Sequence, residues 1–142
     1  MKRTVIAIKG IGGQGKSETI KRLRNLIKST HIHTENILID GGDIKVILDI
    51  KGVKIGLESQ GDPNSRQAKS ISEFVSENCD IIICASRTSG GTIKPILKTK
   101  NDGYRIIWVT NYRSKETSHS VLNNLSVKHL LDLFNQIMSD VI

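Results

Sequence analysis

The chain has 142 residues, of which 37% are hydrophobic, so it can build one domain around a single core and is too short for two. It carries 21 Lys and Arg against 14 Asp and Glu, and the resulting formal charge of +7 predicts anionic partners such as phosphates or nucleic acid. Aromatic residues make up only 4% of the chain, which disfavours a general single-strand binder because such proteins stack many bases on aromatic rings.

Targeting signals and metal-binding cysteines are not expected from the sequence. The first residues are basic and then briefly apolar, but Lys9 interrupts this run before a signal-peptide core or a membrane span can form. Cys79 and Cys84 are typical of buried thiols in a reduced protein, and the histidines have no ligand-like spacing with them. These features predict a cytoplasmic protein that does not contact a membrane.

Six short runs rich in β-branched residues predict the strands of one sheet. They cover residues 4–8, 36–39, 44–50, 53–58, 80–85 and 104–110. Only Lys51 and Gly52 separate the third run from the fourth, so these two form a hairpin and one strand of the sheet is antiparallel. The run 80–85 is apolar on both alternating faces, as in a central strand that helices cover on each side.

Helical patterns lie between these runs. Four helices are expected, beginning near Lys16, at Asp62-Pro63, near Ile93, and at Ser126 as the cap of the last one. Strands that alternate with helices predict an α/β fold with a mostly parallel open sheet, forming a single domain over residues 1–142. Ligands of such sheets bind beyond the carboxyl ends of the strands, here after Ile8, Ile39, Leu57, Ala85 and Val109.

A glycine-rich segment after the first predicted strand carries the clearest chemical signal. Residues 10–17 read Gly-Ile-Gly-Gly-Gln-Gly-Lys-Ser and match G-x-x-x-x-G-K-[ST] at every fixed position. Its glycines let backbone N–H groups turn toward an anion, and the next helix directs its positive dipole end there. Lys16 is expected to reach the β- and γ-phosphates, and Ser17 to bind Mg²⁺. The nucleotide contacts expected here are Gly10, Gly12, Gly13, Gln14, Gly15, Lys16, Ser17 and Glu18.

These eight residues, with the strand before them and the helix after them, resemble the P-loop NTPase superfamily. The resemblance is specific over the segment 1–30 and covers the rest of the chain only by the order of elements. It implies a three-layer P-loop open sheet that binds ATP and Mg²⁺. The loop is also similar to that of the partitioning ATPases and the nitrogenase iron protein, although Ile11 occupies the position of their second lysine.

The magnesium ion of a P-loop needs an acidic partner, expected at the end of a strand beside the first. Asp49 follows an apolar run, but it adjoins the hairpin turn and therefore lies at the end remote from the loop. Glu58 ends the run 53–58 and is the preferred ligand, because the residues after it resemble the Asp-x-x-Gly switch of GTPases. That resemblance makes Gly61 a backbone donor to the γ-phosphate and Gln60 a side chain that orients water.

Asp40, at the end of residues 37–39, is the third candidate for the metal. Asp40 and Asp43 are similar to the acidic residues with which small-molecule kinases bind an acceptor hydroxyl, and turn capping is the structural alternative for both. An enzyme of this class can therefore transfer the γ-phosphate to water or to a small acceptor.

Arginines and one asparagine complete the expected site. Arg66 and Arg87 lie on the predicted active edge, and Arg87 opens a loop rich in Gly, Ser and Thr that can close over phosphates, so it is the arginine expected to act in catalysis. Asn111 follows the last strand without the Lys and Asp of the guanine-reading motif Asn-Lys-x-Asp. ATP is therefore preferred over GTP, with Tyr112 or Arg113 packed on adenine.

Three functions remain open on the sequence alone. The first is a Mg²⁺-dependent NTPase acting on the γ-phosphate, the second a small-molecule or nucleotide kinase, and the third a nucleotide-controlled module that binds nucleic acid or protein. The basic Lys94, Lys98 and Lys100 are typical of solvated faces. Because so short a chain has no room for a large lid, a homodimer or a protein partner is expected to complete the site.

Overall fold

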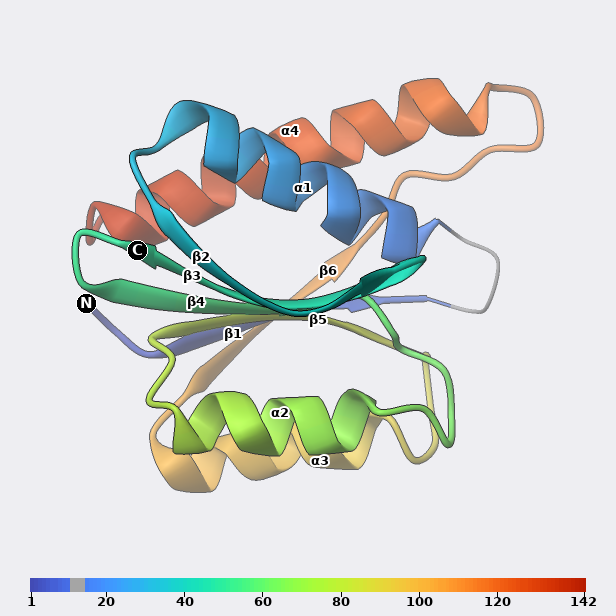
Figure 1. Cartoon of the computed structure of the whole chain (residues 1–142). Helices are drawn as coiled ribbons and strands as arrows, with labels where there is room; N and C mark the ends of the chain where they lie inside the picture. The colour runs from blue at the N-terminus through green and yellow to red at the C-terminus, as the bar shows by residue number, and fades with distance from the viewer. Residues whose placement is uncertain (11–14) are drawn as a thin grey trace.

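The computed structural model describes residues 1–10 and 15–142, which form one six-stranded sheet between two helical layers (Figure 1). The strands are β1 (Thr4–Lys9), β2 (Thr34–Gly41), β3 (Asp43–Ile50), β4 (Val53–Glu58), β5 (Ile81–Ser86) and β6 (Arg105–Thr110). The helices are α1 (Lys16–Thr30), α2 (Gln67–Ser76), α3 (Ile93–Lys98), the 3-10 helix η1 (Thr99–Asp102) and α4 (His119–Met138).

The strand order is β2-β3-β4-β5-β1-β6, and only β3 runs against its neighbours. Strand β1 pairs in parallel with β5 and β6, and β4 pairs in parallel with β5. The predicted α/β class, the mostly parallel sheet and the antiparallel hairpin strand are thus confirmed. One expectation is wrong: β5 lies between β1 and β4, so the strand that ends in Glu58 is not a neighbour of β1.

Alternating side chains of the strands supply a separate core on each face of the sheet. Helices α1 and α4 cover one face, and α2 and α3 cover the other (Figure 1). Strand β1 shows the alternation, since Ile6 and Ile8 belong to the first core while Val5 and Ala7 belong to the second. Both faces of a buried strand such as β1 are therefore apolar, as the unbroken runs of β-branched residues in the sequence predict.

Two helices begin at other residues than the sequence suggests. Helix α2 starts at Gln67 and not at Asp62, because Asn64 adopts φ 59° and the Ser65 N–H donates to the Asp62 carbonyl, which closes a turn. Helix α4 starts at His119, seven residues before Ser126. Buried in the middle of this helix, Ser126 accepts a hydrogen bond from the Tyr112 N–H through its hydroxyl and is not a cap.

The two cysteines are buried and free, as the sequence predicts. Burial raises the pKa of the Cys79 and Cys84 thiols to about 12. Both thiols are therefore protonated at neutral pH, and they pack as small apolar groups beside Phe74 and Ile82.

A glycine in β4 makes a close approach that a larger residue would prevent. A Cβ atom at Gly56 would lie 2.6 Å from Cγ of Phe74, whose ring is fully buried. We expect Gly56→Ala to lower the free energy of unfolding by about 1–3 kcal/mol, because the ring must move within a packed core. Chemical denaturation measures this, with Gly91→Ala as the control, since nothing lies within 4 Å of that position. Equal stability of the Gly56 variant and the wild type would contradict the packing described.

Candidate functional site

The predicted active edge does collect the chemically distinctive side chains. A pocket of about 320 Å³ opens where α1 begins, beside the β2–β3 turn and the segment that follows β4. It is lined by Gly15, Lys16, Ser17, Glu18, Lys21, Asp43, Ser59, Gln60, Gly61 and Asp62. Lys16, Ser17 and Gly61, expected at the site from sequence, therefore share one pocket. The predictions for Gly12, Gly13 and Gln14 lie outside the described residues.

Lys16 is held in a largely buried position next to the glycine-rich segment. Its Nζ donates to the Gly10 carbonyl over 2.5 Å, and only 7% of the residue is exposed. Burial lowers the pKa of Lys16, the nearby Arg87 lowers it further, and Asp62 acts in the opposite direction. Lys16 is thus a largely buried ammonium close to a second, partly exposed cation, an arrangement that an added anion would stabilise.

Ser17 faces an acidic side chain that the sequence did not assign to it. The Ser17 hydroxyl donates to Oδ1 of Asp43 over 2.6 Å, and the Ser59 hydroxyl donates to the same oxygen over 2.8 Å. Burial would raise the pKa of Asp43, but these hydroxyls, Gln60 and Arg66 outweigh it and hold that pKa below its ordinary value. Asp43 is thus an ionised carboxylate in contact with the hydroxyl predicted to bind Mg²⁺.

The oxygen atoms around Asp43 suit magnesium. Hard divalent cations take carboxylate and hydroxyl oxygens, and protein-bound Mg²⁺ keeps several waters while using one or two carboxylates and the substrate phosphates. Among residues 1–10 and 15–142, no three His, Cys, Asp or Glu side chains gather as metal ligands.

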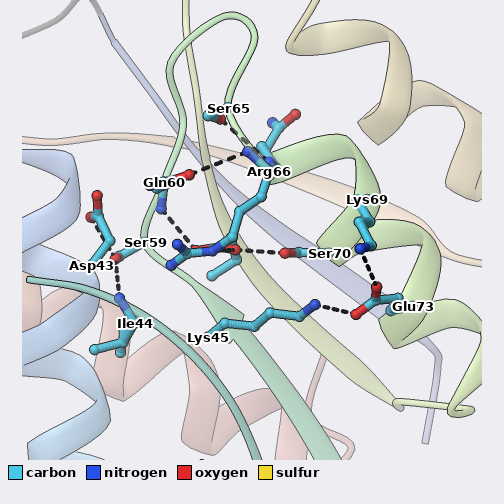
Figure 2. A network of polar contacts seen from close by, with 12 residues as sticks. Asp43, Ile44, Lys45, Ser59, Gln60, Ser65, Arg66, Lys69, Ser70 and Glu73 are labelled. Atoms are coloured by element: carbon cyan, nitrogen blue, oxygen red, sulfur yellow. Dashed lines mark hydrogen bonds and ion pairs between the residues drawn. The ribbon is translucent and has the colours of Figure 1, made fainter. Parts of the chain in front are cut away.

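Glu58 lies just beyond this pocket with both oxygens engaged. The residue is fully buried. Its Oε1 accepts hydrogen bonds from Arg66 Nε over 2.7 Å and from the Ser70 hydroxyl over 2.6 Å. Its Oε2 accepts from Arg66 Nη2 and from the Gln60 N–H, each over 3.1 Å. Figure 2 shows Arg66 and Ser70 converging on this point from α2 and the turn before it. Its role as a metal ligand stays a prediction, and the contacts seen fasten β4 to α2.

The remaining acidic candidates lie elsewhere. Asp40 is half-exposed on β2 and forms an ion pair of 3.4 Å with Arg24 of α1. Asp49 accepts a hydrogen bond from the Gly52 N–H and so caps the β3–β4 turn. Asp49 pairs in register with Thr34 and Lys54, at the end of the sheet opposite Asp43, as its place beside the hairpin predicts.

Short contacts hold the segments after β4 and β5 together. A Cβ atom at Gly61 would lie 2.6 Å from the Ala85 Cβ, so only glycine allows this approach. The Gln67 side-chain amide donates to the Ala85 and Thr92 carbonyls over 2.9 and 3.0 Å. Arg87, which follows β5, forms an ion pair of 2.9 Å with Asp62. The predicted catalytic arginine is therefore tied to the rim of the pocket.

A second pocket, of about 390 Å³, lies between the β6–α4 loop and the start of α4. Tyr112 and Arg113, the residues expected beside the base, line it together with Leu122 and Asn123. A Cβ atom at Gly15 would lie 2.7 Å from Oδ1 of Asn123, so the two pockets adjoin at that glycine. Sequence analysis missed Asn123. Its signal is a polar residue at helical spacing on the apolar stripe of α4, four residues before Val127.

Asn111 connects the end of β6 to α1. Its Nδ2 donates to the buried Thr19 hydroxyl over 2.8 Å. Among the described residues its Oδ1 is buried without a hydrogen-bond partner. This residue therefore links the loop that carries Tyr112 to α1, and its Oδ1 remains available as an acceptor.

The chain has no significant match among protein-family models, curated proteins or solved structures. In the part of the chain that the structure describes, no helix is both long and apolar enough to cross a bilayer.

Proposed function

We propose that this protein binds ATP with Mg²⁺ and hydrolyses the γ-phosphate. The observation that carries the proposal is the contact between Ser17 and the ionised Asp43, in the same pocket as the buried Lys16. A lysine and a hydroxyl at the start of a helix that follows a strand and a glycine-rich segment, with a carboxylate from another strand, are the groups that phosphoryl transfer from a nucleotide requires.

Each group has a distinct part in this proposal. Lys16 binds the β- and γ-phosphate oxygens, and Arg87 offsets the charge that develops on the transferred group. Ser17 and Asp43 hold Mg²⁺, which neutralises phosphate charge when it is bound. Gln60 lines the pocket, and its side chain accepts from the Arg66 N–H over 3.2 Å, so it is positioned by the Glu58–Arg66 pair.

The chemical step is an attack of water on the γ-phosphorus. The water oxygen forms a bond to phosphorus while the bond to the oxygen that bridges the β- and γ-phosphates breaks, and the products are ADP and inorganic phosphate. The base occupies the pocket beside Tyr112, which adjoins the phosphate pocket at Gly15. We assign that base as adenine, since the loop lacks the guanine-reading Lys and Asp.

Transfer to a small acceptor is the second candidate. It relies on acidic residues near the γ-phosphate that are available to an acceptor, but Asp40 is directed to Arg24 and Asp43 is assigned to Mg²⁺ in this proposal. Hydrolysis therefore has the better support. ATP labelled in the γ-phosphate separates the two, because bound ATP that releases no phosphate without an added acceptor would indicate a kinase.

The same assay tests Asp43. We expect Asp43→Asn to lower Mg²⁺-dependent phosphate release by about 10- to 100-fold, because the carboxylate is replaced by a weaker, neutral ligand. The matched control is Asp49→Asn, the same chemical change at the other end of β3, which should leave the rate within about twofold of the wild type. Equal release by the wild type and the Asp43 variant would remove Asp43 from the site.

A further inference from the structure

The excess positive charge of the chain is confined to one side of the fold. Segments 1–9 and 87–118 contain ten Lys and Arg but only two Asp and Glu. The rest of the chain contains eleven Lys and Arg and twelve Asp and Glu. These two segments form β1, α3, η1, β6 and the loop that leads to α4. The formal charge of +7 therefore belongs to the part of the molecule around β6, and the rest is close to neutral.

These cations are mostly not neutralised within the protein. Of the ten, Arg87 alone forms a salt bridge among the described residues, and its partner is Asp62. The other edge strand, β2, differs in this respect: it carries Glu35 and Asp40 with no Lys or Arg. The two edges of the sheet thus have opposite electrostatic character, and an anionic partner is directed to β6.

Exposed cations occur at both ends of β6, with an aromatic ring between them. Within residues 1–10 and 15–142, strand β6 is the outermost strand on its side and pairs with β1 alone. The β6 edge is defined here by Lys2, Lys9, Lys100, Trp108, Arg113 and Lys115. Lys2 and Lys100 lie near the start of β6, whose Arg105 N–H donates to the carbonyl of Arg3, and the loop residues Arg113 and Lys115 follow its end. A six-residue strand spans about 20 Å, which is the length of several nucleotides.

Trp108 lies in the middle of this edge and is 38% exposed. Lys9 Nζ is 5.3 Å from the centre of its ring, so a cation and an aromatic face are presented together. Few aromatics in the composition argue against a protein that stacks many bases, but a single ring among unpaired cations suits a partner held mainly by its phosphates.

We propose that the β6 edge binds nucleic acid through its phosphates. A bilayer with anionic headgroups is a poorer fit, because surface binding of that kind uses a long amphipathic helix and α3 has only six residues. The proposal is independent of ATP hydrolysis, since none of Lys2, Lys9 and Lys100 lines the phosphate pocket.

The test uses the single tryptophan of the chain as its reporter. The full chain is titrated with a 20-nucleotide single strand and with a 20-base-pair duplex, and Trp108 fluorescence is followed at several salt concentrations. We expect saturable binding of at least one of them, with an affinity that falls steeply as salt rises because counterions are released. No fluorescence change and no binding at low salt would overturn the proposal.

Variants of equal charge show whether this edge is responsible. Replacing Lys2, Lys9 and Lys100 by Gln should weaken binding about tenfold or more and reduce the slope of log affinity against log salt by about two to three. Replacing Lys51, Lys54 and Lys69 by Gln removes the same charge from the other side and should change affinity by less than about twofold. Equal losses in the two triple variants would contradict the assignment to β6.

Two further measurements separate this site from other anion binding. Lys16→Ala should keep its affinity for the oligonucleotide, and loss of binding there would place the nucleic acid in the nucleotide pocket instead. Polyglutamate or phosphatidylserine vesicles that bind as tightly as the oligonucleotide at equal salt would overturn the choice of partner.

Chemical acetylation of lysines in the wild type, with and without oligonucleotide, gives a readout that needs no substitutions. The oligonucleotide should protect Lys9 and Lys100 from acetylation and leave Lys69 as reactive as before.

Discussion

Lys16→Ala is expected to reduce the affinity for ATP by about 10- to 150-fold. The lysine ammonium is the cation predicted to contact the β- and γ-phosphates, and a hydrogen bond between charged groups contributes about 1.5–3 kcal/mol. Isothermal titration calorimetry with Mg²⁺-ATP measures the loss directly. Because Lys16 is a largely buried cation whose pKa is lowered by that burial, its removal should leave the free energy of unfolding unchanged or slightly raised.

The matched control for this substitution is Lys69→Ala. Lys69 is exposed on α2, and its ion pair with Glu73 of 3.8 Å is of the surface kind that contributes little. The affinity of the Lys69→Ala variant for ATP should therefore equal that of the wild type. If Lys16→Ala binds ATP as tightly as Lys69→Ala does, the glycine-rich segment does not bind the triphosphate.

The second large effect is expected at the buried ion pair of β4 and α2. Arg66→Ala leaves the Glu58 carboxylate, which is fully buried, without its two guanidinium donors. Removing one partner of a buried pair typically costs 3–5 kcal/mol, and since Arg66 is 23% exposed we expect a loss of about 3 kcal/mol in the free energy of unfolding. Urea denaturation at neutral pH measures it.

A second substitution distinguishes the charge from the packing at this place. In the double variant Glu58→Gln, Arg66→Ala, no unpaired carboxylate remains, so part of the lost stability should return. Lys69→Ala again serves as the exposed control, with an expected change below about 1 kcal/mol. An Arg66→Ala protein as stable as that control would show that the pair contributes nothing to holding α2 on β4.

Local sequence patterns were sufficient to predict the strands, whereas phosphate binding by the glycine-rich segment stays a prediction. The hairpin at Lys51 and Gly52 follows from its length alone, and both residues adopt the positive φ that such a turn requires. The first residues of α2 and α4 could not be predicted from the sequence. Ser126 has the chemistry of a cap, but its hydroxyl serves the Tyr112 N–H of another segment, and no local rule contains that contact.

The acidic partner of Ser17 could not be found from local patterns either. Asp43 lies 26 residues away in sequence and reaches Ser17 because β3 begins at the same edge where α1 begins. That juxtaposition depends on the strand order, in which β5 separates β4 from β1 and removes Glu58 from the neighbouring position. Strand order depends on the packing of the whole sheet. The carboxylate that contacts Ser17 can therefore be identified only once the fold is known.

The most direct test of the account is a crystal structure of the protein with Mg²⁺ and a non-hydrolysable ATP analogue. It should show the triphosphate against Lys16 and the metal bound by Ser17 and Asp43, with the base in the pocket beside Tyr112. A triphosphate seated away from Lys16, or a metal held by Glu58 with Asp43 still bonded to Ser17 and Ser59, would contradict it.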